Sequence, residues 1–120
     1  MKDVRRLQIY QDAYQLSLEI YIETRKFPSD EIFGLTAQLR RAAYSIAANI
    51  AEGYRKKSPK EKLHFYNTSL CSLEECRYFA SLATDLKYME HNKFDSRLDQ
   101  VGRNLFNYSQ AIKKNPMEGL

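Results

Sequence analysis

The fold of this chain is decided at residues 35–53, which run Leu-Thr-Ala-Gln-Leu-Arg-Arg-Ala-Ala-Tyr-Ser-Ile-Ala-Ala-Asn-Ile-Ala-Glu-Gly. Apolar side chains recur there at steps of three and four residues, the spacing that places them on one face of an α-helix. Leu35, Leu39, Ala42 and Ile46 begin this stripe. The segment shows no alternation of period two, so it predicts a helix rather than a half-buried strand.

Three further segments carry the same helical period. Their apolar stripes begin at Ile9, at Leu63 and at Phe94. Phe27-Pro28, the stretch from Gly53 to Pro59 and the polar residues 88–92 interrupt the pattern. We therefore expect a single domain, residues 1–120, with helices at residues 8–26, 31–53, 58–88 and 92–114 and a tail at residues 115–120.

Capping signals support these boundaries. Ser58, Pro59 and Glu61 form the pattern of a capping box with proline at the first helical position. Asn92, with an aspartate three residues later, suggests the start of the last helix, and we expect Gly53 to end the second helix in a left-handed conformation. Because short connections place neighbouring helices antiparallel, the sequence predicts an all-α, antiparallel up-down-up-down four-helix bundle.

The composition limits the class of protein. Hydrophobic residues make up 43% of the 120 residues and charged residues 28%, which is typical of a folded chain and not of a disordered one. No apolar run approaches the ~18 residues of a membrane span. The basic residues near the N-terminus are not followed by the apolar segment of a signal peptide. We therefore expect a cytoplasmic protein that does not associate with membranes.

The residues that carry catalytic and metal chemistry are poorly placed. Cys71 and Cys76 lie about 140° apart around a helix, so they do not share a face as metal ligands. A di-iron bundle uses two Glu-x-x-His motifs, which the sequence does not supply. The serines have no evident histidine partner, and no glycine-rich phosphate loop occurs. We expect no metal, no cofactor and no enzymatic activity.

Positive charge is concentrated in one part of the chain. Residues 38–62 hold seven cations and two carboxylates, whereas the whole chain has a net charge of +4. Five of these cations lie in or beside the connection that ends at Ser58, where a helix N-terminus also favours an anion. A solvated basic loop and a surface for an acidic protein partner remain alternatives to a nucleic-acid site. The candidate contacts to RNA or DNA are Arg40, Arg41, Arg55, Lys56, Lys57, Lys60 and Lys62.

The second helix carries more apolar surface than one core requires. Its additional face consists of small and aromatic residues, namely Ala37, Tyr44, Ala48 and Ala51. A bundle of this size cannot easily cover that face in a single copy, so we expect a homo-oligomer. Ala43 and Ala47 are expected at close helix contacts, either within one bundle or at the subunit interface.

A row of polar residues follows the same helix. Arg41 and Asn49 lie four residues on either side of Ser45, and Glu52 lies three residues beyond Asn49. One interpretation is a polar stripe that faces a ligand. The other, which we favour, is a hydrogen-bond network that fixes the helix register and is joined by Glu75 of the third helix.

These residues occur in an order and spacing that resembles one known family. The chain is similar to the bacterial four-helix-bundle family of 23S rRNA intervening-sequence proteins, whose pattern runs roughly FP..E.yGL..QlrRAa.SI..NIAEG..r. Differences include Tyr10, where the family often has tryptophan, and Cys71, where it has glycine. The matching segments are Phe27-Pro28, Glu31-Ile32-Phe33-Gly34-Leu35, Gln38-Leu39-Arg40-Arg41-Ala42-Ala43, Ser45-Ile46 and Asn49-Ile50-Ala51-Glu52-Gly53.

The resemblance implies an assembly and a set of partners. The family's bundles assemble as ring-like homopentamers, and their reading frames lie within intervening sequences of 23S rRNA genes. A related branch serves as the accessory protein of diversity-generating retroelements, where it is linked to nucleic acid and to a reverse transcriptase. The resemblance therefore implies a non-catalytic RNA- or DNA-binding homopentamer. The alternative is an oligomeric scaffold that docks a protein partner, such as a reverse transcriptase, through its basic rim.

Overall fold

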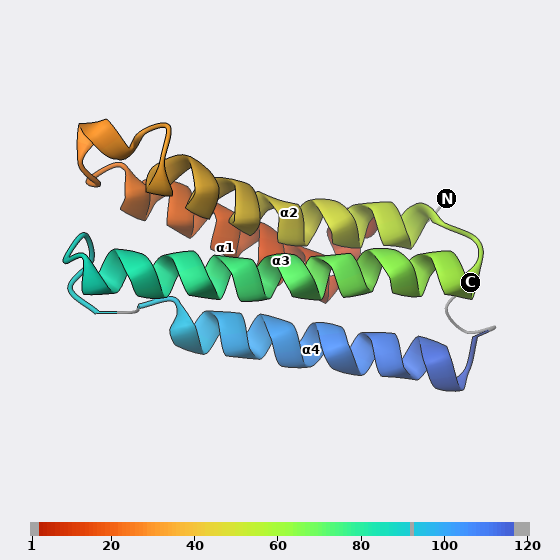
Figure 1. Cartoon of the computed structure of the whole chain (residues 1–120). Helices are drawn as coiled ribbons and strands as arrows, with labels where there is room; N and C mark the ends of the chain where they lie inside the picture. The colour runs from red at the N-terminus through yellow and green to blue at the C-terminus, as the bar shows by residue number, and fades with distance from the viewer. Residues whose placement is uncertain (1–2, 92, 117–120) are drawn as a thin grey trace.

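The chain folds as an antiparallel bundle of four α-helices in the computed structural model, which describes residues 3–91 and 93–116 (Figure 1). The prediction of an all-α four-helix bundle is confirmed. The bundle measures 47 × 22 × 20 Å. In chain order its elements are the 3₁₀ turn η1 (Val4–Arg6), α1 (Gln8–Thr24), the 3₁₀ turn η2 (Ser29–Glu31), α2 (Leu35–Arg55), α3 (Pro59–Asp85) and α4 (Asp95–Lys114).

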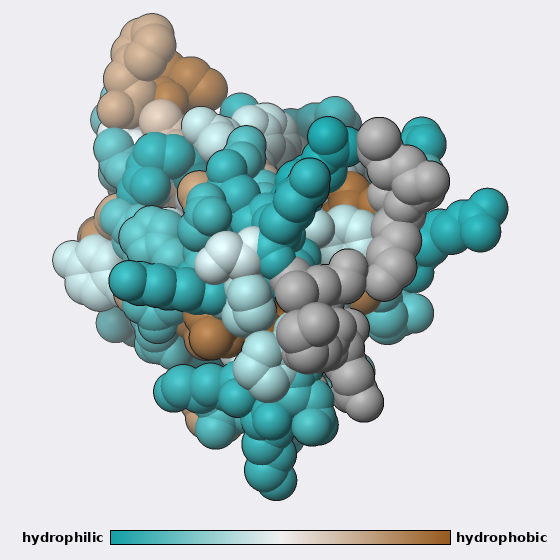
Figure 2. Space-filling model, turned by 90° about the vertical axis from the view of Figure 1, so that its right-hand side faces the viewer, coloured by the Kyte–Doolittle hydropathy of each residue, from teal (hydrophilic) through white to brown (hydrophobic). Residues whose placement is uncertain are grey.

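The alternation of helix directions decides which segments meet at each end. The start of α1, the α2–α3 connection and the end of α4 lie together at one end, on the right in Figure 1 and facing the viewer in Figure 2. The η2 segment and the α3–α4 connection lie at the opposite end. No helix in the described part of the chain is long and apolar enough to cross a bilayer.

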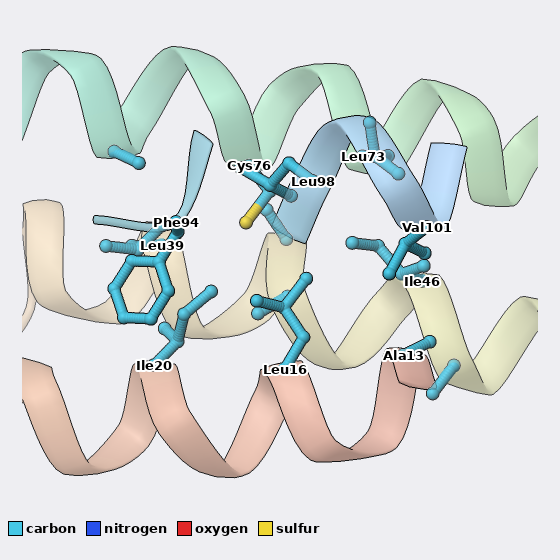
Figure 3. Packing of buried hydrophobic residues seen from close by; sticks show 14 of the residues in the cluster. Ala13, Leu16, Ile20, Leu39, Ile46, Leu73, Cys76, Phe94, Leu98 and Val101 are labelled. Carbon is cyan, nitrogen blue, oxygen red and sulfur yellow. The ribbon is translucent and has the colours of Figure 1, made fainter. Parts of the chain in front are cut away.

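The core is a cluster of apolar side chains that the four helices contribute between them (Figure 3). Leu16 and Ile20 of α1 and Leu39 of α2 are fully buried in it. The second helix packs most extensively against α3 and also against α1. Alanines allow the close approach to α1, where Ser17 Oγ lies 3.2 Å from the Ala43 carbonyl oxygen and donates a hydrogen bond to it. Ala43 and Ala47 are thus buried within one bundle.

Several helix boundaries differ from the expected ones. The first helix ends at Thr24, before the Phe27-Pro28 pair, because a residue that precedes proline is disfavoured in helical conformation. Residues 29–31 form the separate turn η2, and α2 begins at Leu35, whose N–H bonds to Glu31 Oε1 at 3.2 Å. The last helix begins at Asp95, and the expected cap Asn92 lies outside the described residues. Of the expected tail, residues 117–120 also lie outside them.

The third helix begins as predicted but ends differently. Ser58 is its N-cap and accepts a hydrogen bond from the Glu61 N–H, with proline at the first position. At the other end Lys87 has φ 68°, the only positive φ of a non-glycine residue in the described chain. The Lys87 N–H bonds to the Thr84 carbonyl and the next N–H bonds to the Ala83 carbonyl, the two bonds of a Schellman motif. A lysine therefore ends the helix at a position where glycine is usual.

Gly53 does not have the role expected from the sequence. The second helix continues through it to Arg55, and its φ is not positive. Its lack of a side chain is needed instead because the buried ring of Tyr66 lies against it. A Cβ at Gly53 would lie 2.6 Å from Tyr66 Cε1. The glycine is required for helix packing and not for helix termination.

Candidate nucleic-acid interface

The α2–α3 connection presents cations at one end of the bundle. Arg55, Lys57 and Lys60 are exposed, whereas Lys56 is half-buried. The Lys56 ammonium lies 5.2 Å from the centroid of the Phe65 ring, within the range of a cation–π contact. Three of these positions therefore offer exposed charge next to the N-terminus of α3.

The bundle brings more cations to this end. Arg5 and Arg6 precede α1, and Lys113 and Lys114 end α4. Arg5 hydrogen-bonds to Asp3 and lowers the pKa of that carboxyl group to about 2. Hydrophilic side chains cover most of this surface in Figure 2. We call this surface the basic end and define it by the exposed or half-buried cations Arg5, Arg6, Arg55, Lys56, Lys57, Lys60, Lys113 and Lys114.

Charge counted along the sequence did not identify the contributions of α1 and α4. Each of those segments has cations of its own, but neither shows a local excess as large as that of residues 38–62. The predicted antiparallel helix order could have identified these cations, because it places the first residues of α1 and the last residues of α4 beside the α2–α3 connection.

Lys62, which the sequence suggested as a phosphate contact, is not among the exposed cations of the basic end. Its side chain is only 4% exposed. The ammonium donates hydrogen bonds to the carbonyl oxygens of Gly53 (3.2 Å) and Tyr54 (2.9 Å) and lies 5.6 Å from the Tyr54 ring centroid. Lys62 thus caps the C-terminus of α2, where a cation compensates the partial negative charge of the helix end.

Arg40 and Arg41 also lie away from the basic end. Arg55 follows Arg40 by 15 residues on the same helix, a rise of about 22 Å. Arg40 stacks over the Tyr21 ring at 4.7 Å and donates to Thr24 Oγ1 at 2.7 Å. Its partners are therefore side chains and backbone of α1.

The polar row on α2 forms a network with α3. Arg41 Nη2 lies 2.7 Å from Glu75 Oε2, and the hydroxyl groups of Ser45 and Ser72 are 2.8 Å apart. The Asn49 amide donates to the Ser45 carbonyl and to the Ser45 hydroxyl. These contacts support the structural interpretation of the row. Glu52 is exposed and, among the described residues, makes no hydrogen bond within this network.

Exposed apolar side chains lie one turn from this network on both helices. Tyr44 follows Arg41 by one turn of α2, and Tyr78 follows Glu75 by one turn of α3. Tyr44 is 50% exposed and Tyr78 is 62% exposed. Leu82 lies one turn beyond Tyr78 and is also exposed. We call these three side chains the α2–α3 face.

Among the described residues, no three histidine, cysteine, aspartate or glutamate side chains are grouped as they would be around a metal ion. Burial raises the pKa of the Cys76 thiol to about 12, which keeps it in the unreactive thiol form.

Comparison with known proteins supports the architecture. The model of the family described as 23S rRNA-intervening sequence protein matches residues 5–107. A solved structure from the S23 ribosomal protein family of Bacteroides thetaiotaomicron VPI-5482, a protein of unknown function, is similar with a TM-score of 0.60 and 17% sequence identity. The similarity covers 87% of this chain and 94% of that chain, and at this identity it shows the fold alone. No curated protein matches the sequence.

Proposed function

The chain belongs to the family of 23S rRNA-intervening sequence proteins, and from this premise we propose that it is a non-catalytic, oligomeric protein that binds RNA or DNA through its basic end. The observation that carries the proposal is the convergence of cations from three parts of the chain on one surface. These parts are the start of α1, the α2–α3 connection and the end of α4. Closely spaced cations are the main source of affinity for a phosphate backbone.

The electrostatics of the helix ends support the same proposal. The C-terminus of α2 would repel phosphate through its free carbonyl groups. Lys62 hydrogen-bonds to two of those carbonyl groups and so reduces this repulsion. Helix α3 begins four residues after the end of α2, and its N-terminus favours an anion. Asp3, Glu52 and Glu61 offset part of the positive charge of this end.

Four of the seven contact residues expected from the sequence remain in the proposal, and four others join them. Arg55, Lys56, Lys57 and Lys60 remain, and Arg5, Arg6, Lys113 and Lys114 are added. Arg40 and Arg41 are left out because they lie away from the basic end, and Lys62 is left out because it is buried and bonds to the end of α2.

Assembly is part of the proposal. Tyr44 precedes the last residue of α2 by 11 residues, and Tyr78 follows the first residue of α3 by 19 residues. The exposed α2–α3 face therefore lies along the side of the bundle, separate from the basic end. We infer that copies of the chain associate through this face and form the homopentamer implied by the resemblance. A ring would repeat the basic end around one rim, and a long strand that spans several copies would gain affinity by avidity.

The experiment is a salt titration of RNA and duplex DNA binding. The triple variant Lys56→Gln, Lys57→Gln, Lys60→Gln should flatten the dependence of log affinity on log salt by roughly two units per subunit engaged, because each lost phosphate contact lowers the slope by about 0.7 for a single strand and 0.9 for a duplex. A matched control, Arg25→Gln, Lys26→Gln, Lys87→Gln, removes the same charge at the opposite end and should leave the slope nearly unchanged.

Two outcomes would contradict the proposal. If both triple variants lose affinity equally, binding follows net charge and not the basic end. If the parent binds neither nucleic acid at low salt but binds one protein with little salt dependence, the basic end is a docking surface for that protein.

A further inference from the structure

A groove between α3 and α4 opens onto the basic end. Leu63 and Leu70 of α3 and Phe106 of α4 form its apolar lining. Asn67, Gln110 and Lys113 line it as well. Phe106 is 52% exposed, so about half of its surface is open to solvent. The groove combines an aromatic surface, two amides and a cation.

The groove is continuous with the proposed phosphate contacts. Lys60 lies one turn before Leu63 on α3, and Asn67 follows Leu63 by one turn more. On α4, Phe106, Gln110 and Lys113 follow one another at steps of four and three. Because α3 and α4 are antiparallel, Lys60 and Lys113 both lie toward the end of the groove at the basic end. A phosphate backbone bound there would place its bases within reach of the groove.

The size and the lining of the groove suit a nucleobase. The groove encloses about 260 Å³, which is less than the roughly 300–1,000 Å³ of sites for drug-sized ligands. An aromatic ring accepts the flat face of any base by stacking. Asparagine and glutamine side chains each offer a donor and an acceptor to a base edge. Among the described residues, neither the Asn67 nor the Gln110 amide forms a hydrogen bond that would occupy it.

We propose that the α3–α4 groove binds an unpaired base, stacked on Phe106, of a single-stranded nucleic acid whose phosphates lie on the basic end. This inference rests on the proposed function and narrows its ligand from RNA or DNA in general to a single strand. A duplex buries the faces of its bases in the stack, so it can use the basic end but not the groove. Single strands should therefore bind more tightly than duplexes at equal salt.

The test uses the full chain and an end-labelled oligouridylate strand, either free or annealed to oligoadenylate. Phe106→Ala should weaken binding of the free strand roughly 5- to 150-fold, the range for removal of one stacking side chain, and leave duplex binding unchanged. Phe106→Tyr should retain the parent affinity. Phe33→Ala is the matched control, since Phe33 is 93% exposed in the segment before α2 at the opposite end.

A second measurement locates the contact directly. Ultraviolet irradiation of a 5-iodouridine-substituted strand should cross-link it to the peptide that contains Phe106, and Asn67→Ala together with Gln110→Ala should reduce that yield. The inference is overturned if Phe106→Ala leaves single-strand affinity unchanged, weakens duplex binding equally, or cross-links map outside the groove. In those cases the salt dependence of the lysine variants still decides the proposed function. If the parent binds neither strand nor duplex at low salt, both proposals fail.

Discussion

The ring of Tyr66 occupies the space that a side chain at Gly53 would need. A Cβ on Gly53 would lie 2.6 Å from Tyr66 Cε1 and 3.2 Å from the Cβ of Phe65. Tyr66 is fully buried and its ring also packs edge-on against Tyr108, with 5.5 Å between centroids. The ring cannot move aside without disturbing the contact between α3 and α4.

We predict that Gly53→Ala destabilises the fold. Overpacking costs typically 1–3 kcal/mol, and a better helix propensity returns at most about 1 kcal/mol. Urea denaturation should therefore show a lower midpoint. Gly102→Ala is the matched control, because its Cβ would meet Leu73 at an ordinary 3.4 Å. That variant should be neutral or stabilising by up to about 1 kcal/mol. An unchanged midpoint for Gly53→Ala would contradict the close contact.

Ala43 provides a second test of helix packing. It is fully buried where its carbonyl oxygen accepts the Ser17 hydroxyl. Ala43→Leu should overpack the α1–α2 contact and lower the free energy of unfolding by roughly 1–3 kcal/mol. Ala111→Leu places the same side chain at an exposed position of α4 and should change the free energy of unfolding little. Equal effects of the two variants in chemical denaturation would show that Ala43 of α2 does not face α1.

The helices could be predicted from the sequence because their apolar stripes determine which faces are buried. Ile46 and Leu98, for example, both lie on predicted stripes and are fully buried. The roles of Gly53, Lys62 and Lys87 could not be predicted, since each depends on a contact or a backbone angle that only the folded chain defines. The neighbouring residues in the sequence are the same for a glycine at a helix end or a lysine in a basic run whatever packs against it in the fold, so they do not reveal that contact. The α3–α4 groove has no sequence signal, because its lining comes from two separate helices.

Lys62 should contribute to stability and not to phosphate binding. Its ammonium bonds to two carbonyl groups at the end of α2, and a hydrogen bond to a charged group is worth about 1.5–3 kcal/mol. Lys62→Met should therefore lower the free energy of unfolding by that order, while the salt slope of RNA binding stays near the parent value. Lys60→Met should instead reduce the salt slope of RNA binding and leave the free energy of unfolding near the parent value. A reduced slope with unchanged stability for Lys62→Met would place Lys62 among the phosphate contacts.

Glu23 should make stability depend on pH. Burial raises the pKa of this carboxyl group, but hydrogen bonds from Lys26 and Lys93 outweigh it, so the pKa lies below its ordinary value. A carboxylate with a depressed pKa stabilises the fold above its unfolded pKa of about 4.3, and this contribution is lost as the pH falls through the folded pKa. Glu23→Gln should thus destabilise the protein at pH 7 and much less at pH 3. Thermal unfolding across this range provides the measurement. An equal loss at both pH values would mean that the charge of Glu23 contributes nothing.

Assembly through the α2–α3 face is open to a direct test. Tyr44 and Tyr78 expose half or more of their surfaces beside the Arg41–Glu75 ion pair, and an apolar patch of this kind marks an interaction surface. The parent should therefore sediment at equilibrium as a multiple of the 14.1 kDa chain, with five copies for a ring. Tyr78→Glu would bury an unpaired carboxylate in the interface and should shift the population toward the monomer.

The control for Tyr78→Glu is Ser96→Glu, which adds the same charge at an exposed position of α4. It should leave the mass unchanged, and circular dichroism should show the parent's helix content in both variants. If assembly repeats the basic end around one rim, the Tyr78→Glu monomer should also lose the avidity for long RNA but keep the parent's affinity for a strand that fits one subunit. A parent that sediments as a single copy at micromolar concentration would contradict the assembly. A Tyr78→Glu variant that stays fully assembled would show that the interface lies on another face.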